Sequence, residues 1–267
     1  MIGNSFSEDT TQYIYEIAKA AGINDVIVKN MYIGGCSLES HYSNAIQDKA
    51  AYNYQYYENG SWVRSYSYDT SIKTAVSEQD WDYISLQQAS SASGKPESYD
   101  YLHSLMRYVL QNATNKNVKL LWNMTWAYQG NYSGLSQYNS DQTTMYNAIV
   151  NTVKAKVLTE NFYKVIPCGT AIQNARTSFM GDTLTRDGFH LSYDVGRYIA
   201  ALTLFKEISG FDISNINYAP SGIFGDYKKM CIESSTNAVN KPFEVIQSAY
   251  TKEPEIISEE EIGEKSR

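Results

Sequence analysis

The stretch that decides the fold class runs from Asp9 to Gly35 and has the sequence DTTQYIYEIAKAAGINDVIVKNMYIGG. In its first half, residues 9–21, the apolar side chains share one helical stripe, and Gly22 is a typical helix stop. In its second half, residues 26–33 form a short apolar run that ends in two glycines and indicates a buried strand. A helix followed directly by a buried strand is typical of α/β proteins.

The same alternation continues along the chain. Further strands are predicted at residues 83–86, 118–124 and 163–166, and further helices at 99–110, 143–157, 195–208 and after Phe224. Alternating strands and helices favour βαβ units, so we expect an α/β fold with three layers, α/β/α, around a central, mainly parallel sheet.

One segment interrupts this order. Tyrosines alternate with polar residues from position 52, Asn59-Gly60 supplies a tight turn, and a second alternating run continues to position 68. This pattern predicts an inserted Tyr-rich hairpin over about 52–68. We therefore expect one domain over residues 1–251, with the hairpin as an insertion. Residues 252–267 are rich in Glu, which predicts an acidic, disordered tail.

Charge and cysteine content exclude several classes of function. The net charge is −7, and no basic stripe is present, so nucleic acid is not an expected partner. No apolar run reaches the roughly 18 residues that a membrane helix needs, and no signal peptide is visible. Cys36, Cys168 and Cys231 lie far apart without a CxxC motif, so neither a disulfide framework nor a metal site is expected.

Four polar segments stand at predicted strand ends or helix starts, where ligands bind in open α/β sheets. The first is Gly3-Asn4-Ser5-Phe6-Ser7. Ser5 precedes a helix, whose free N–H groups and dipole can stabilise an oxyanion. A plain N-cap is the alternative. The segment is not the G-x-S-x-G elbow of α/β-hydrolases, because Ser7 stands where the last glycine should be.

The second and third segments can supply hydrogen-bond donors. Gly34-Gly35 follows the strand at 26–33 and lets the backbone approach a ligand, although an ordinary tight turn is the alternative. Gln87-Gln88 follows the strand at 83–86. A side-chain amide there can donate to developing negative charge, and solvation of a loop is the alternative.

The fourth segment is Thr185-Arg186-Asp187-Gly188-Phe189-His190-Leu191-Ser192. Asp187 and His190 are three residues apart in a turn broken by glycine. The carboxylate can therefore orient the imidazole, which can act as a general base on a serine. A capped surface turn is the alternative. The other two histidines, His41 and His103, lack such a partner and are expected to be structural or exposed.

Together these segments resemble the SGNH (GDSL-like) hydrolase superfamily, named for its catalytic Ser, Gly, Asn and His. The resemblance covers roughly residues 3–208 and is most specific at the Asp187–His190 block followed by Gly196-Arg197-Tyr198. The chain looks especially like an uncharacterised bacterial branch that begins G-N-S-F-S and carries a Leu-Gln-Gln block. The resemblance implies an SGNH, flavodoxin-like fold. It also implies a first strand of about five residues before Gly3, so the first strand is expected to be truncated here.

The resemblance further implies a triad of Ser5, Asp187 and His190. The N–H groups of Ser5 and Gly35 and one side-chain amide would form the oxyanion hole. The family supplies that amide from an asparagine, which is absent here. We predict that Gln88 or Gln87 takes its place.

The expected activity is that of a serine esterase, which needs no cofactor. The chain holds 24 Tyr and 4 Trp, which favours a polar, aromatic binding surface and hence an O-acetylated carbohydrate as substrate, either a small molecule or a polysaccharide. The predicted sugar contacts follow the strand at 118–124 and are Trp122, Asn123, Trp126 and Tyr128. A core role is the alternative for Trp122. A thioesterase or lysophospholipase, or a catalytically silent glycan-binding protein, are the alternative functions. The sequence is compatible with a cytoplasmic or a secreted protein.

Overall fold

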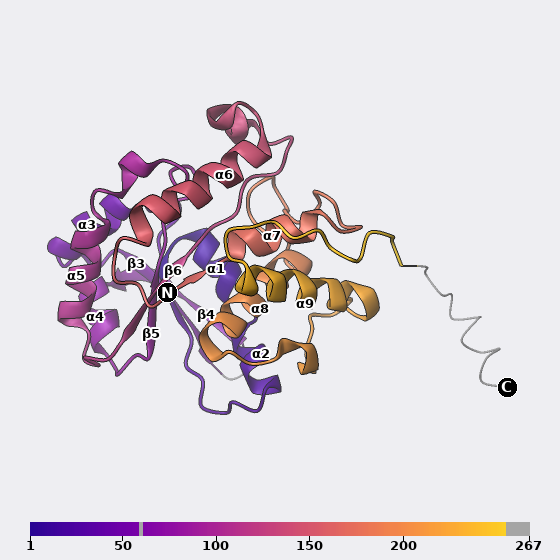
Figure 1. Cartoon of the computed structure of the whole chain (residues 1–267). Coiled ribbons are helices and arrows are strands. Elements are labelled where there is room, and N and C mark those ends of the chain that lie inside the picture. The colour runs from indigo at the N-terminus through magenta and orange to yellow at the C-terminus, as the bar shows by residue number, and fades with distance from the viewer. Residues whose placement is uncertain (59–60, 255–267) are drawn as a thin grey trace.

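A computed structural model describes residues 1–58 and 61–254 and shows an α/β protein (Figure 1). The strands are β1 (Ile2–Gly3), β2 (Lys29–Tyr32), β3 (Tyr52–Glu58), β4 (Ser61–Thr70), β5 (Tyr83–Leu86), β6 (Lys119–Asn123) and β7 (Lys164–Ile166). The α-helices are α1 (Ser5–Thr11), α2 (Ile14–Ala20), α3 (Leu38–Ile46), α4 (Ile72–Ser77), α5 (Leu102–Asn112), α6 (Gln142–Thr152), α7 (Cys168–Arg176), α8 (Val195–Ser209) and α9 (Gly225–Asn240).

The strands form two hydrogen-bonded sheets rather than the predicted single, mainly parallel one. One is mixed, in the order β1-β2-β3-β4, and the other is parallel, in the order β5-β6-β7. In the mixed sheet, Met31 of β2 pairs in parallel with Ile2 of β1 and antiparallel with Tyr54 of β3. The inserted hairpin therefore covers the outer edge of β2, which would otherwise leave its backbone groups unpaired. The hairpin prediction is confirmed at its strands, whereas Asn59-Gly60 lies outside the described residues.

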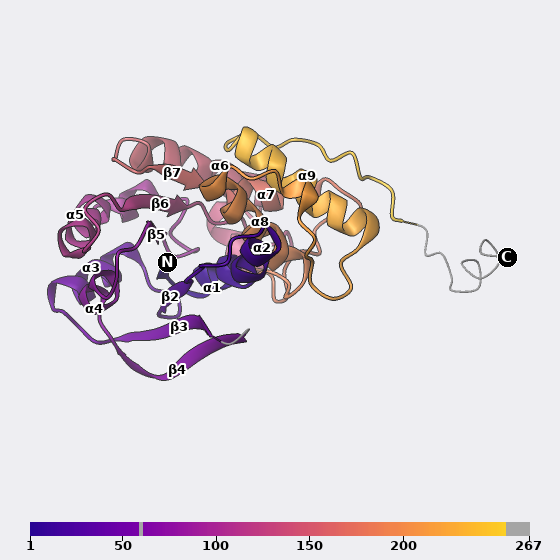
Figure 2. The ribbon, with the colours of Figure 1, turned by 90° about the horizontal axis from the view of Figure 1, so that it is seen from below.

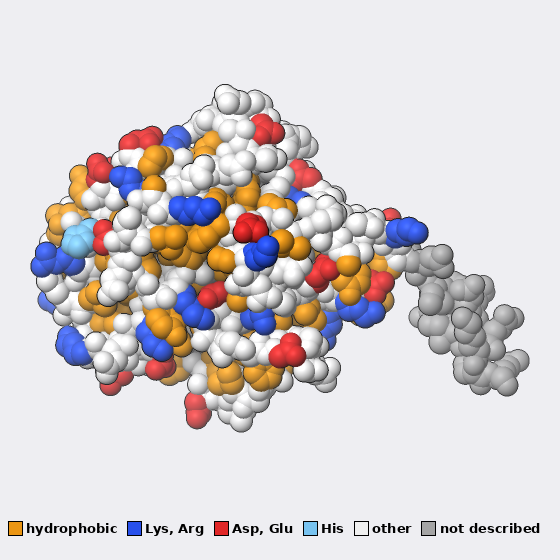
Figure 3. Space-filling view, in the orientation of Figure 1, with side chains coloured by type: hydrophobic (Ala, Val, Ile, Leu, Met, Phe, Trp, Pro, Cys, Tyr) orange, Lys and Arg blue, Asp and Glu red, His pale blue; other side chains and the backbone are white. Residues whose placement is uncertain are grey.

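Helices flank the strands on both sides (Figure 2). On one side lie α3, α4 and α5, and on the other lie α1, α2, α7, α8 and α9. Helix α8 is buried on nearly all of its faces, among α1, α2, α7 and α9. A helix that is buried on most of its surface is a typical core element. On the face drawn in Figure 3, acidic and basic side chains are interspersed. No helix in the described part of the chain combines the length and apolar character needed to cross a membrane.

Three local predictions differ from the structure. The helix predicted at 9–21 is two helices, and the indole Nε1–H of Trp62 donates to the Gln12 carbonyl at the break, 2.7 Å away. The strand predicted at 26–33 is shorter, and the helices α3, α4 and α7 were not predicted. In α7, a Cβ on Gly169 would lie 2.2 Å from the Thr125 carbonyl oxygen, so that contact requires glycine. The tail predicted from 252 lies mostly beyond the described residues, which end at 254.

His41 is a buried structural residue, which is one of the two roles predicted for it. Its Nδ1 lies 2.7 Å from the Tyr52 hydroxyl oxygen and 3.4 Å from the Cys36 sulfur. Burial lowers the pKa of His41 to about 3, against about 6.5 for a free imidazole. Below pH 6.5 the His41 ring therefore binds a proton in the unfolded chain but stays neutral in the folded one. Acid thus favours unfolding.

We expect the free energy of unfolding to fall by about 2 kcal/mol between neutral pH and pH 5 because of His41 alone. His41→Gln should remove that contribution while lowering stability at neutral pH. Urea unfolding of both proteins at pH 7.5 and pH 5.0 measures the difference. Equal losses in the two proteins would show that His41 does not cause the acid sensitivity.

Candidate active site

Ser5 is the first residue of α1, and one residue, Asn4, separates it from β1. Asn4 is the N-cap: its Oδ1 accepts the Phe6 N–H at 3.0 Å, and its Nδ2 donates to the Cys36 carbonyl oxygen at 3.1 Å. The same side chain therefore fixes the start of the helix and the loop that carries Gly34 and Gly35. Ser5 is therefore not the helix cap, which was the alternative interpretation of this serine.

Asp187 and His190 lie in a turn between α7 and α8. The Arg186 N–H donates to the His190 carbonyl oxygen at 2.9 Å and closes this turn. Gly188 has a φ of +95°, and a Cβ there would lie 2.5 Å from the ring of Tyr132. Both the backbone conformation and the close ring require glycine at this position.

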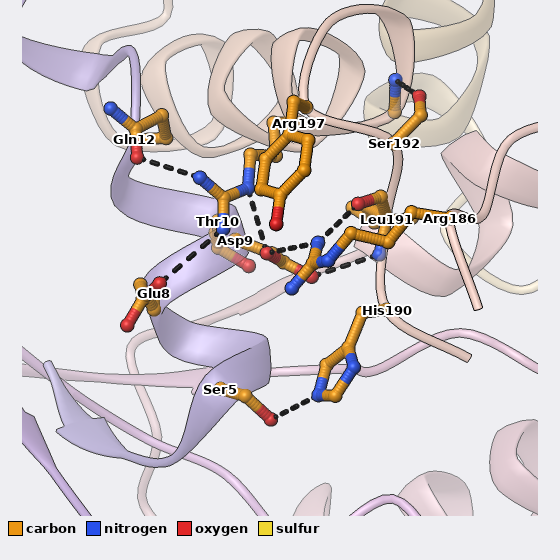
Figure 4. Close-up of polar contacts among 12 residues, drawn as sticks. Ser5, Glu8, Asp9, Thr10, Gln12, Arg186, His190, Leu191, Ser192 and Arg197 are labelled. Carbon is orange, nitrogen blue, oxygen red and sulfur yellow. Dashed lines mark hydrogen bonds and ion pairs between the residues drawn. The ribbon is translucent and has the colours of Figure 1, made fainter.

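The three predicted triad residues form one hydrogen-bonded chain. The Ser5 Oγ lies 2.8 Å from the His190 Nε2, and the His190 Nδ1 lies 2.6 Å from the Asp187 Oδ2. Figure 4 shows Ser5 on α1 and His190 on the opposite loop, with their side chains pointing toward each other. With the ring proton on Nδ1, facing the carboxylate, Nε2 is free to accept the serine proton.

The Asp187 carboxylate is held as an anion. Burial acts to raise its pKa, but the hydrogen bonds from the His190 ring and from the N–H groups of His190 and Phe189 outweigh this and keep the pKa below its ordinary value. Those N–H groups donate to Asp187 Oδ1 at 2.8 Å and 3.2 Å. Asp187 is therefore an acceptor for the imidazole through the neutral pH range.

Ser5 and His190 border a cavity of about 280 Å³, which Gly35, Ser90 and Phe189 also line. Among the described residues, no acceptor is found for the N–H of Ser5 or of Gly35. Both groups are therefore available to a ligand oxygen. The Phe189 ring lies 3.9 Å from the His190 ring, centroid to centroid. Tyr32 lines the same cavity. Phe189, Tyr32 and Ser90 were not singled out from the sequence, although Phe189 belongs to the Asp187–His190 block.

The side chains of Gln87 and Gln88 contradict the prediction that one of them donates to an oxyanion. The Gln87 Nε2 donates to Asn4 Oδ1 at 2.8 Å, and its Oε1 accepts from Asn123 at 2.9 Å. The Gln88 Nε2 donates to the carbonyl oxygen and the Oγ of Ser98. Both amides are buried, and neither residue lines the cavity beside Ser5. Asn4, 83 positions earlier in the chain, supplies the acceptor for the Gln87 amide.

The residues predicted to contact a sugar are not exposed. Trp122, Asn123, Trp126 and Tyr128 are all buried, at most 5% exposed. Trp126 stacks on Phe6 with ring centroids 4.3 Å apart, and its Nε1–H donates to the Phe189 carbonyl oxygen at 2.7 Å. Tyr128 supports the cavity wall from behind, since its hydroxyl lies 2.9 Å from the Ser90 Oγ. Trp126 and Tyr128 therefore support the site from behind, and none of the four residues lines the cavity.

A larger cavity of about 350 Å³ lies apart from the triad. Its lining is mostly apolar and includes Ile2, Val28, Ile84 and Phe205. It contains no histidine, and none of the three triad residues borders it. The cavity beside Ser5 is therefore the candidate site.

No group of three His, Cys, Asp or Glu side chains within residues 1–58 and 61–254 is arranged to hold a metal ion.

The fold and the site define an α/β protein in which a helix-start serine meets an Asp-x-x-His turn. The chain belongs to the family described as Domain of unknown function (DUF4886), whose model matches residues 1–238. It is similar to the crystal structure of a DUF4886 family protein from Bacteroides uniformis ATCC 8492, with 40% sequence identity and a TM-score of 0.89. That match covers 94% of this chain and 97% of the other. The comparison with curated proteins finds no match.

Proposed function

We propose that this protein is a serine esterase with an SGNH-type fold. The observation that carries the proposal is the continuous chain from Ser5 Oγ through the His190 ring to Asp187, with distances of 2.8 Å and 2.6 Å. An activated serine lies within hydrogen-bond reach of a base, and a third group orients that base. A plain helix cap requires none of these contacts.

In the acylation step, the His190 Nε2 takes the proton of Ser5 as its Oγ attacks the ester carbonyl carbon. The carbonyl oxygen becomes an oxyanion, which the free N–H groups of Ser5 and Gly35 can bind. The tetrahedral intermediate then collapses: the bond to the alcohol oxygen breaks, and His190 gives its proton to that oxygen. The product is an acyl ester on Ser5 and a free alcohol.

In the deacylation step, His190 takes a proton from water, and the resulting hydroxide attacks the acyl carbon. The same two N–H groups bind the second oxyanion. The bond to the Ser5 oxygen then breaks, and His190 returns the proton to that oxygen. The acid leaves and the triad is restored.

The cavity favours a short acyl group. Its volume of about 280 Å³ is at the lower end for ligand sites, about 300–1,000 Å³. Its small lining residues include Gly34, Gly35, Ala89 and Ser90, which leave room for a methyl group beside Ser5. The rings of Tyr32 and Phe189 also border it and offer apolar faces to a sugar ring. An O-acetylated carbohydrate remains the proposed substrate, with these two rings in place of the tryptophans.

Covalent labelling and product analysis test the proposal together. A fluorophosphonate should add once to the protein, and peptide mapping should place the adduct on Ser5, with no adduct in His190→Gln. Acetate should be released from acetylated sugars or polysaccharides faster than long-chain acids are released from matched esters. An adduct elsewhere, or equal labelling of His190→Gln, would contradict the triad. Faster release of long-chain acids would favour a lysophospholipase or thioesterase instead.

A further inference from the structure

Asp9 is a fully buried carboxylate on α1, one helical turn after Ser5. Its Oδ1 accepts from Arg186 Nη1 at 3.0 Å and from Arg197 Nε at 2.8 Å. Its Oδ2 accepts the Leu191 N–H at 2.8 Å. Figure 4 shows this cluster directly beside the pair formed by Ser5 and His190. The proposed mechanism uses none of these groups.

The cluster holds Asp9 in a single arrangement. Burial raises the pKa of Asp9 above its ordinary value, although the two guanidiniums beside it act in the opposite direction. Arg197 is anchored further by Gln12 Oε1 at 2.8 Å and Glu8 Oε1 at 3.3 Å. A buried ion pair contributes little net stability because desolvation offsets its Coulomb energy, but it can enforce one geometry.

Two of the three donors to Asp9 border the turn that carries Asp187 and His190. Arg186 precedes Asp187, and Leu191 follows His190. The Arg186 guanidinium also donates to the Leu191 carbonyl oxygen, and the Arg186 N–H donates to that of His190. Asp9 therefore binds both ends of the turn, whereas its own backbone belongs to the helix that begins with Ser5.

We infer that Asp9 is a positioning residue that fixes the separation between Ser5 Oγ and His190 Nε2. The inference rests on the proposed esterase activity. Within one turn of α-helix the Cα atoms of Ser5 and Asp9 keep a fixed spacing. Because Asp9 holds the turn, and helix α1 holds Asp9 at a fixed spacing from Ser5, the distance between Ser5 Oγ and His190 Nε2 is fixed as well. A misplacement of about 1 Å can cost about 100-fold in rate.

Asp9→Asn tests the inference, and Glu8→Gln is the matched control. Both changes remove one negative charge from neighbouring positions of α1. Glu8 contacts Arg197, Arg64 and Gln55 but no residue between 186 and 191. We expect Asp9→Asn to lower kcat on an acetyl ester by about 10- to 100-fold, with KM within about twofold. Glu8→Gln should stay within about threefold in kcat, although both variants should melt at lower temperature.

A second variant and a second readout keep the test decisive. If Asp9→Asn does not fold, Arg186→Gln removes one donor from a partly exposed position and should also lower kcat selectively. The low-field proton resonance of the His190 Nδ1–H, assigned by its loss in His190→Gln, requires no activity. It should shift or disappear in Asp9→Asn and persist in Glu8→Gln.

Equal losses of kcat in Asp9→Asn and Glu8→Gln, or an unchanged His190 resonance in Asp9→Asn, would overturn the positioning role. A wild-type protein without esterase activity would instead contradict the proposed function. In that case the resonance alone would still decide whether Asp9 positions His190.

Discussion

Ser5→Ala is expected to lower kcat for acetyl ester hydrolysis by about 10⁴- to 10⁶-fold. The change removes the only atom that forms the covalent intermediate, whereas the N–H groups of Ser5 and Gly35 remain in place to bind the substrate carbonyl. KM should therefore change little. Single-turnover kinetics with an activated acetyl ester, combined with acetate release from the carbohydrate substrate, measures the loss.

Ser7→Ala is the matched control for this prediction. Ser7 lies two residues further along α1, is fully buried, and donates its hydroxyl proton to the Asn4 carbonyl oxygen at 2.7 Å. Its loss should cost about 1 kcal/mol of stability and leave kcat within about threefold. A Ser5→Ala protein with the activity of wild type would contradict the assignment of the nucleophile.

Asp187→Asn is expected to lower kcat by about 10²- to 10⁴-fold with KM nearly unchanged. The substituted amide can present its nitrogen to the His190 Nδ1. The ring would then keep its proton on Nε2, which faces Ser5 and could no longer accept the serine proton. The fold should persist, because Asp187 is 43% exposed and the amide oxygen can still accept from the backbone N–H groups.

Steady-state kinetics of Asp187→Asn and Asp187→Ala separate two explanations for such a loss. If the wrong ring tautomer causes it, Asp187→Asn should be at least as slow as Asp187→Ala, which leaves the tautomer unrestrained. A rate for Asp187→Asn close to that of wild type would show that the carboxylate does not orient His190. Melting temperatures of both variants serve as the control for folding.

Two kinds of signal in the sequence were sufficient for prediction. Period and composition predicted most elements, such as the strand at 83–86 and the helix at 195–208, because each depends on which side chains face the core. Short-range chemistry predicted the Asp187–His190 turn, because a carboxylate three residues before an imidazole can reach it without help from the rest of the chain. The N-terminal block likewise suggested Ser5 through its place before a helix.

The predictions that failed concern side chains whose partners are distant in the sequence. Gln87 and Gln88 were expected at the oxyanion hole because each amide follows a strand. The acceptors that occupy these amides come from Asn4 and Ser98, and no local pattern reveals them. Trp126 was expected to contact a sugar, but it is buried against the Phe6 ring and donates to the Phe189 carbonyl oxygen. The pairing of the hairpin with β2 was missed for the same reason, since period alone does not say which strand lies beside which.

The sequence by itself determined the α/β class, the hairpin and the candidate Ser, His and Asp residues, because these depend on local pattern and on side-chain chemistry. Only the tertiary structure decided that Ser5 and His190, 185 positions apart, lie 2.8 Å from each other. It also decided which donors are free and that Asp9 ties the two segments together. Hydrogen bonds and ion pairs between distant segments form only after the core has packed, so their geometry is a property of the fold as a whole.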